Sequence, residues 1–484
     1  MVKQTLDKDL GRIETIGTEA MHGSARYKAL ALAVLFLLIV WAFSASVTAA
    51  GEHSTLIIIA AIIGGYMALN IGANDVANNV GPAVGSRALT MFGALIIAAI
   101  FEAAGAILAG GDVVNTIQKG IINPASMQNS EVFIWAMMSA LFAAALWVNI
   151  ATWVGAPVST THAVVGGVMG AGIAAAGFSI VDWGTMSAIA ASWVISPIMG
   201  GAIAAIFLAF IKYNVIYKDD KVSASRRWVP LLVAIMAGVF SAYLVTKGLK
   251  RIWRPDAVTV FAISLAFFAG TYAIVKPVIH RASVGMENRN KSVRALFTIP
   301  LICSAALLSF AHGANDVANA VGPLAAIVET STSGAIDAKV GIPLWVMLIG
   351  AAGLSAGLFL FGPKLIRTVG EQITKMNPMR AYCVALSAGI TVLIASALGL
   401  PVSSTHIAVG AVFGVGFFRE WDTERRARKL RESLRDEKIH PDSNLPATEL
   451  DQSENRPKKL VRRSQLMTIV AAWVITVPSA ALLS

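Results

Sequence analysis

A polar segment inside a strongly apolar run constrains this chain more than any other feature. Residues 72–82 read GANDVANNVGP and residues 313–323 read GANDVANAVGP, so the two segments agree at ten of eleven positions. A carboxylate at membrane depth costs at least a few kcal/mol and persists where it meets a cation, a polar partner or water. Because Asp75 and Asp316 occupy equivalent places in the two copies, we expect one site built from two halves.

The composition places the chain in a membrane. It has 484 residues, of which 56% are hydrophobic and only 14% charged, outside the usual range of soluble domains. A membrane-spanning helix needs about 20 mostly apolar residues, and roughly a dozen such windows are present. The net charge of +11 collects in the segments between them, which is typical of positive-inside loops. We therefore expect a lipid bilayer and no nucleic acid as partner.

The apolar windows predict the division of the chain. We expect a polar N-terminal arm at 1–27, an extra N-terminal span at 28–49, a first repeat at 55–211, a linker with two spans at 212–295 and a second repeat at 296–484. Residues 47–49 resemble a signal-peptide cleavage site, but the polar region before them is unusually long for one. We favour a retained span.

The predicted fold class is an all-α polytopic membrane protein with two repeats of about five membrane segments and broken helices. Five segments and two linker spans make an odd number, so the second repeat enters from the opposite side and the repeats are inverted. Basic loops mostly agree with a cytoplasmic N-terminus. The exception is the loop that holds Lys247, Lys250, Arg251 and Arg254, which would lie outside. The charged segment 420–463 is expected to be a cytoplasmic, partly helical insertion.

A second pair of segments supplies hydroxyl groups. Residues 155–162 read GAPVSTTH and residues 399–406 read GLPVSSTH, with agreement at six of eight positions. Proline suits the first turn of a helix, and a helix N-terminus attracts anions. Glycines follow closely in both copies, among them Gly166 and Gly410, and they permit close helix packing.

Together the two kinds of segment predict a carrier. Asn74, Asp75 and Asn78 offer hard oxygen ligands for a small cation, and we expect the helix to unwind at Gly72 and at the Gly81-Pro82 pair. The hydroxyl-bearing helix starts offer neutral donors to an oxyanion. Inverted repeats, broken helices and a midplane site are typical of secondary transporters.

At these residues the chain resembles the inorganic phosphate transporter family, the sodium- or proton-coupled phosphate carriers, from about residue 55 onward. The resemblance implies symport of inorganic phosphate with sodium or protons. The cation-binding residues it implies are Asp75, Asn78, Asp316, Asn319 and Glu102. The phosphate-binding residues it implies are Ser159, Thr160, Thr161, Ser403, Ser404, Thr405, Asn74 and Asn315. Some eukaryotic relatives carry a further glutamate where this chain has Ala385.

Several polar residues allow two interpretations. His162 and His406 suit either a proton relay or a hydrogen-bonding brace at a helix start. His312 precedes only the second acidic segment and is the weaker candidate. Lys119 is placed in a loop, where it guides anions or is simply solvated. The null alternatives are structural: a buried hydrogen bond for the acids, and helix caps for the hydroxyls.

We predict a multi-pass transporter of the inner (cytoplasmic) cell membrane, with no cofactor and no transition metal. A homodimer is the candidate assembly. The close rival is a permease for sulfate or another oxyanion, since neutral donors alone do not distinguish these anions. The distant rival is a membrane-embedded enzyme with Ser159 or Ser403 as nucleophile and His162 or His406 as base, although a catalytic site needs one asymmetric constellation.

Overall fold

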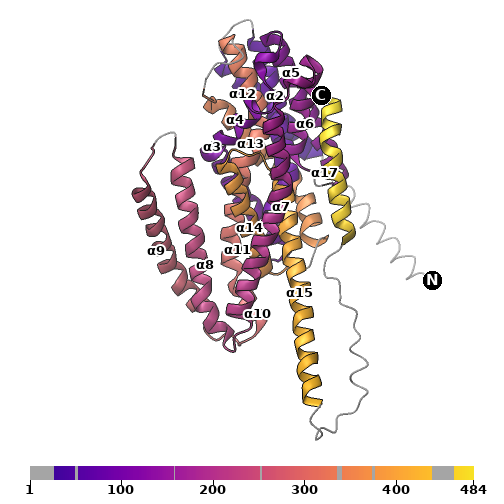
Figure 1. The fold of residues 1–484 in the computed structure, drawn as a ribbon. Helices are drawn as coiled ribbons and strands as arrows, with labels where there is room; N and C mark the ends of the chain where they lie inside the picture. Colours follow the sequence, from indigo (N-terminus) through magenta and orange to yellow (C-terminus); the bar gives the residue numbers. More distant parts are fainter. Residues whose placement is uncertain are drawn as a thin grey trace, which may run out of the picture.

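The computed structural model describes residues 27–48, 53–156, 158–250, 253–334, 341–372, 376–438 and 463–484. This part of the chain is helical (Figure 1), and its only β pairing is an isolated bridge between Ile122 and Val181. Ten of the described helices are long and apolar enough to cross a membrane. The predicted all-α polytopic class is therefore confirmed.

The helices follow the predicted windows closely. A first helix spans Tyr27–Val47. The next are α2 (Ser54–Gly85), α3 (Met91–Ala109), α4 (Gly111–Lys119), α5 (Ser130–Val154), α6 (Thr160–Ala176) and α7 (Trp183–Ile211). Then come α8 (Lys221–Tyr243), α9 (Ala257–Ala282) and α10 (Asn290–Leu296). The last are α11 (Thr298–Asp316), α12 (Ala318–Ser333), α13 (Leu344–Gln372), α14 (Pro378–Ala397), α15 (Ser404–Lys438) and α17 (Arg463–Leu483).

The helices that carry the two acidic segments pack against helices from the opposite part of the chain. Helix α2 lies along α13, and α11 lies along α3. A methyl group on Gly72 would lie 2.0 Å from the backbone oxygen of Leu354, and one on Gly313 would lie 2.0 Å from that of Glu102. Only glycine permits this approach, so each acidic segment is fixed by a backbone contact across the molecule.

The hydroxyl-bearing helices interlock in the same way. Helix α6 packs against α17, and α15 packs against α7. A methyl group on Gly166 would lie 2.5 Å from the backbone oxygen of Val477, and one on Gly410 would lie 2.2 Å from that of Pro197. The predicted close packing at these glycines is confirmed, and it joins residues from both ends of the chain.

Neither acidic segment unwinds the helix that carries it. Helix α2 runs unbroken through Gly72 and includes Pro82, so the predicted unwinding there is wrong. Gly72 serves close packing instead, as its contact with Leu354 indicates. In the second copy α11 and α12 meet at Val317, whose backbone is helical (φ −55°, ψ −30°) and whose oxygen accepts from the Val321 N–H, so Thr298–Ser333 is one continuous helical stretch.

Helix α4 corrects the predicted loop around Lys119. It is short and amphipathic, which is why a search for long apolar windows misses it. Asp112 on α4 lies 2.9 Å from the Lys247 ammonium and 3.3 Å from that of Lys250. Burial raises the pKa of Asp112, but these two lysines outweigh it and hold that pKa below its usual value. Lys247 and Lys250, two of the basic residues that do not follow the positive-inside rule, therefore have Asp112 as a local partner.

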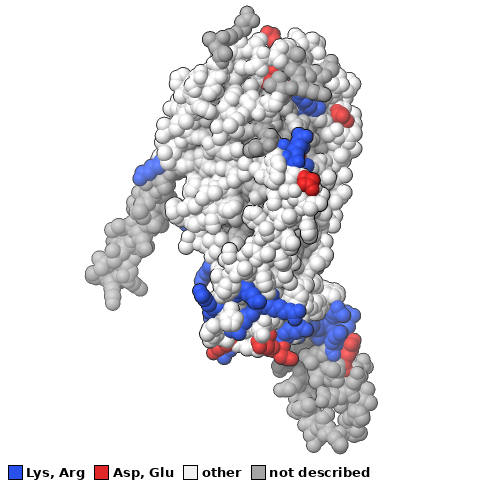
Figure 2. Space-filling view, turned by 90° about the vertical axis from the view of Figure 1, so that its left-hand side faces the viewer, with Lys and Arg blue, Asp and Glu red and all other residues white. Residues whose placement is uncertain are grey.

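Basic side chains gather near one end of the molecule, in the blue band toward the bottom of Figure 2. Helix α15 continues from the apolar part of the chain to Lys438, so the predicted insertion begins as a helix. Asp422 on this extension lies 2.6 Å from the Lys212 ammonium and accepts a hydrogen bond from Tyr217. Residues 439–462 of the insertion and residues 1–26 of the predicted arm lie outside the described residues.

The inverted relation of the repeats stays a prediction. Helix α6 has 17 residues, about 25 Å of helix, which is shorter than the roughly 30 Å hydrocarbon core of a bilayer. The number of crossings therefore does not follow from helix length alone. The boundaries at 55–211 and 296–484 likewise remain predictions.

Candidate functional site

The acid of the first segment receives hydrogen bonds from both hydroxyl clusters. Thr160, the first residue of α6, donates to Asp75 Oδ2 at 2.8 Å. Thr405, at the start of α15, donates to Asp75 Oδ1 at 3.0 Å. These two threonines are 245 residues apart in the chain, by subtraction of 160 from 405. The expectation of one site built from two halves is met at this carboxylate.

The acid of the second segment has a different set of partners. Ser404 donates to Asp316 Oδ2 at 2.8 Å. Among the described residues, Asp316 Oδ1 has no hydrogen-bond partner. Thr161, the counterpart of Thr405, donates to the backbone oxygen of Val402 instead, at 2.9 Å. The two acids are thus equivalent in sequence but not in their hydrogen bonds.

Two amides orient the threonine hydroxyls. Asn78 donates to Thr405 Oγ1 at 2.8 Å, and Asn319 donates to Thr160 Oγ1 at 3.3 Å and Thr161 Oγ1 at 3.1 Å. Each amide reaches the hydroxyl cluster of the opposite half. Because their oxygens accept from an amide, Thr160 and Thr405 have their own hydrogens directed to Asp75, whereas the hydrogen of Thr161 is directed to the Val402 oxygen.

Asn74 and Asn315 hold the loops before the hydroxyl clusters. Asn74 Nδ2 donates to Thr152 Oγ1 at 2.9 Å and to the oxygen of Ala156, and Asn74 Oδ1 accepts from the Val158 N–H at 3.2 Å. Asn315 makes the matching bonds. Its partners are Ser396, the oxygen of Leu400 and the Val402 N–H. Direct contact of either amide with phosphate, as predicted, requires these bonds to break.

The remaining serines of the clusters act as helix caps. Ser159 Oγ accepts from the His162 N–H at 3.1 Å, and Ser403 Oγ accepts from the His406 N–H at 3.3 Å. Accepting these bonds leaves each serine its own hydroxyl hydrogen to donate. The imidazole rings of His162 and His406 lie edge to face, with centroids 4.4 Å apart. Both interpretations of these histidines stay open.

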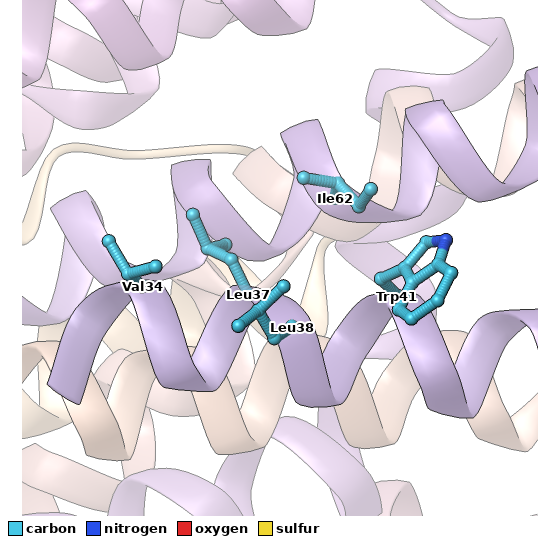
Figure 3. A pocket seen from close by; sticks show the side chains of 5 residues that line it. All are labelled: Val34, Leu37, Leu38, Trp41 and Ile62. Atoms are coloured by element: carbon cyan, nitrogen blue, oxygen red, sulfur yellow. The ribbon is translucent and has the colours of Figure 1, made fainter. Parts of the chain in front are cut away.

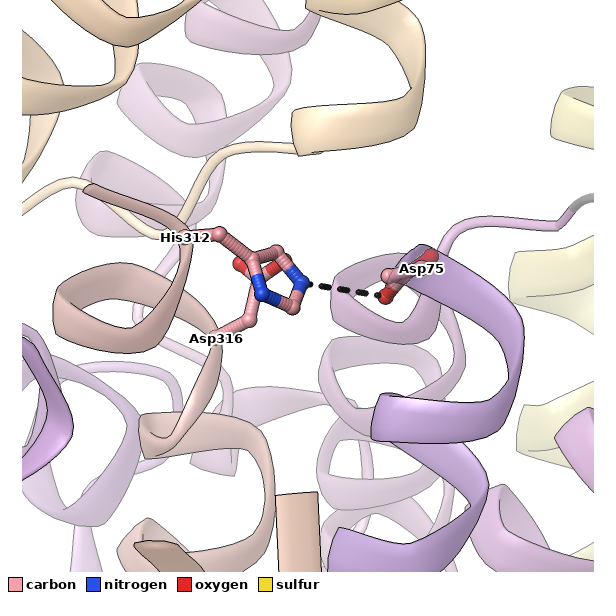
Figure 4. Close-up of side chains that lie close together, drawn as sticks. All are labelled: Asp75, His312 and Asp316. Carbon is pink, nitrogen blue, oxygen red and sulfur yellow. Dashed lines mark ion pairs between the residues drawn. The ribbon is translucent and has the colours of Figure 1, made fainter. Parts of the chain in front are cut away.

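His312 lies among three acids, which the sequence analysis did not anticipate. Its Nε2 is 2.9 Å from Asp316 Oδ2 and 3.8 Å from Asp75 Oδ2, as Figure 4 shows. Its Nδ1 is 3.3 Å from Glu102 Oε1. Glu102 also accepts from Asn79 Nδ2 at 2.7 Å. The predicted Glu102 is therefore joined to the two acids through this imidazole.

The predicted site residues lie in the interior. Each of the thirteen predicted side chains is at most 3% exposed. Donor atoms of Asp75, His312 and Asp316 lie within 4.8 Å of one another, a group that could hold a metal ion. Three buried carboxylates with one imidazole leave excess negative charge, which a bound cation would offset.

Other polar and hollow features lie outside this cluster. Lys119 is 2.9 Å from Glu329 on α12, so it is paired rather than a free guide for anions. An apolar groove of about 380 Å³ is lined by Val34, Leu37, Leu38, Trp41 and Ile62 (Figure 3). The groove lies between the first helix and α2 and contains none of the predicted site residues.

Comparison with known proteins agrees with the geometry. The phosphate transporter family matches residues 71–484. A protein of Helicobacter pylori (strain J99), whose name proposes a phosphate permease, is 48% identical over 94% of this chain and 93% of its own length. A Pyrococcus abyssi protein with the same proposed activity is 34% identical over 87% of this chain and 95% of its own length.

A solved structure described as the sodium-dependent phosphate transporter is similar to this fold. Its TM-score is 0.77 at 35% sequence identity, and the match covers 89% of this chain and 97% of that one. The family match includes both acidic segments and both hydroxyl clusters. The chain therefore belongs to the phosphate transporter family.

Proposed function

We propose that this protein takes up inorganic phosphate by symport with sodium or protons. The observation that carries the proposal is the contact of Asp75 with Thr160 and Thr405, one from each hydroxyl cluster. The proposed cation ligand, Asp75, is thus hydrogen-bonded directly to two proposed phosphate donors. Binding of phosphate and binding of a cation then affect the same atoms.

The hydroxyl clusters are the proposed phosphate site. Thr160, Thr161, Ser404 and Thr405 are at most 2% exposed, and they stand at the first turns of α6 and α15. Neutral donors at a helix start suit an oxyanion. Ser159 and Ser403 complete the set as caps that retain a hydrogen to donate. Asn74 and Asn315 would serve phosphate indirectly, because they hold the loops that present these donors.

The acids and amides are the proposed cation site. Asp75, Asn78, Asp316 and Asn319 supply hard oxygen ligands, and Glu102 extends the negative charge through His312. A cation offsets the charge of the entering phosphate. The description of the similar solved structure names sodium, which makes sodium the first ion to test, with the proton as the alternative.

The proposed cycle uses the interlocked halves. Paired helices drawn from the two inverted repeats, at 55–211 and 296–484, would rock and expose the buried site to one side of the inner membrane and then the other. The pair of helices α2 and α13 would move as one unit, and so would the pair α11 and α3, because the close packing at glycine leaves no space for the helices to slide at those points.

Uptake of radiolabelled phosphate into proteoliposomes tests the proposal. The purified protein should accumulate phosphate under an inward sodium gradient or a proton gradient, and excess unlabelled sulfate should not compete. Loss of accumulation with sulfate would move the assignment to an oxyanion permease. A chemically altered product would indicate an enzyme, and absence of gradient-driven flux would contradict transport.

A further inference from the structure

The two threonines at Asp75 each have one hydrogen to donate. A threonine hydroxyl carries a single donor and two acceptor sites. Thr160 and Thr405 spend that hydrogen on the two oxygens of Asp75, at 2.8 and 3.0 Å. One acceptor site of each hydroxyl is occupied, by the amide of Asn319 at Thr160 and by that of Asn78 at Thr405. Neither hydroxyl can donate to phosphate while it donates to Asp75.

Phosphate binding therefore changes the surroundings of Asp75. When the hydroxyl hydrogens turn to a phosphate oxygen, the carboxylate loses both hydroxyl donors and keeps His312 Nε2, 3.8 Å away, as its neighbour, while it remains buried, at 1% exposure. A buried carboxylate with no donor at hydrogen-bond distance is strongly disfavoured. A cation at Asp75 restores the balance, so phosphate binding raises the affinity of this position for a cation.

We propose that Asp75 is a switch between two threonine donors and a coupling cation. Thr160 and Thr405 donate their hydrogen bonds to phosphate instead of to Asp75. The cation then binds the carboxylate in place of the two hydroxyls. The inference rests on the proposed function and adds the physical link between the two bound species. Cation binding to this acid follows phosphate.

Asp316 differs from Asp75 in the way that the switch requires. Asp316 Oδ1 and Asn319 Oδ1 are buried and have no hydrogen-bond partner among the described residues. The two residues are three positions apart, about one helical turn, in the continuous helical stretch Thr298–Ser333. A cation finds two free acceptor oxygens here without displacing a hydroxyl. The second acid is thus the position that fills before phosphate, and Asp75 is the position that fills after it.

Counting bound cations with and without phosphate tests the switch. The full chain is placed in lipid nanodiscs, and bound ²²Na⁺ is measured at equilibrium. Protons taken up in sodium-free buffer are measured in parallel and corrected for the protonation of free phosphate. The wild type should bind one further cation per chain when phosphate is added. By reciprocity, that cation should tighten phosphate binding about tenfold or more.

The double variant Thr160→Val/Thr405→Val should separate the two binding events. Valine keeps the shape of threonine and removes the donor, so Asp75 is left without hydroxyl partners. The further cation should then bind without phosphate, and phosphate affinity should lose its dependence on the cation. Thr391→Val is the matched control, because Thr391 is buried and donates within its own helix, to the Ser387 oxygen at 2.8 Å. It should behave as the wild type.

The outcomes distinguish this inference from the proposed function. If the wild type binds phosphate but binds the same number of cations with and without it, the switch is overturned, and the proposal of phosphate transport is unaffected. A double variant whose cation still depends on phosphate would also overturn it. A wild type that binds no phosphate would contradict the proposed function itself.

Discussion

At the scale of single residues, the proposal depends most on the two acids, Asp75 and Asp316. Asp75→Asn and Asp316→Asn each remove one buried charge while keeping the side-chain shape. We expect each variant to lose at least about tenfold of gradient-driven phosphate uptake, because a hydrogen bond or contact to a charged group is worth roughly 1.5–3 kcal/mol. Both variants should insert and purify as monodisperse protein, and near-normal uptake in either one would exclude that acid from an essential role.

We expect Asn315 to stabilise the loop that precedes α15. Asn315→Ala removes bonds to Ser396, the Leu400 oxygen and the Val402 N–H, and leaves buried groups unpaired. The expected cost is about 1–3 kcal/mol, measured as a lower thermal unfolding midpoint in detergent. Asn214→Ala is the control, since Asn214 makes one bond, to the Phe210 oxygen in the same helical segment. Equal midpoints for the two variants would contradict this role.

Most of the candidate site residues could be predicted because their segments occur twice in the sequence. The others have no polar counterpart in the other copy. Asp75, Thr160 and Thr405 belong to segments that occur twice, and the structure brings these three together. His312 and Asn79 have apolar counterparts, Ile71 and Ala320, at the matching positions of the other copy. A difference inside an otherwise repeated segment is therefore the sequence signal that marks these two positions.

At the scale of helices, Gly72 tests the close packing of α2 on α13. A methyl group there would lie 2.0 Å from the Leu354 oxygen, too close for any rearrangement of a side chain to relieve. We expect Gly72→Ala to lower the yield of folded protein severely, measured by fluorescence-detected size-exclusion chromatography. Gly270→Ala on α9 should be neutral, because nothing lies within 4 Å of its added methyl. Equal yields would show that α2 adjusts freely.

The ion pairs of Asp112 on α4 with Lys247 and Lys250 make the stability of the fold depend on pH. The lysines at Asp112 hold its pKa below the ordinary 3.8, so the folded state binds fewer protons here than the unfolded state. The stabilisation is present above that ordinary value and is lost as the pH falls through the lower folded value. We expect the unfolding midpoint of the wild type to fall more below pH about 4 than that of Asp112→Asn. Parallel curves for the two proteins would contradict this contribution.

The helix pattern was predictable where the chain is uniformly apolar. The apolar windows at 132–154 and 184–211 predict helices, and the structure has α5 at Ser130–Val154 and α7 at Trp183–Ile211. They could not give α4, which is too short and too polar for a membrane window, nor the continuity of α2 through Pro82. Both helices contact the second half of the chain, α4 through the Lys119–Glu329 ion pair and α2 through the packing of Gly72 against Leu354.

At the scale of the whole molecule, the halves are interlocked rather than adjacent. Helices α6 and α15 present their hydroxyls to the same acid while each packs on a helix from the other end of the chain. Neither half completes the site alone. The central claim is that both hydroxyl clusters build a single phosphate site.

Equilibrium binding of radiolabelled phosphate to wild type, Thr160→Val and Thr405→Val tests that claim most directly. One phosphate per chain should bind to the wild type, and either substitution should weaken that same single class of sites. Two classes of sites, of which each substitution removes only one, would contradict a shared site.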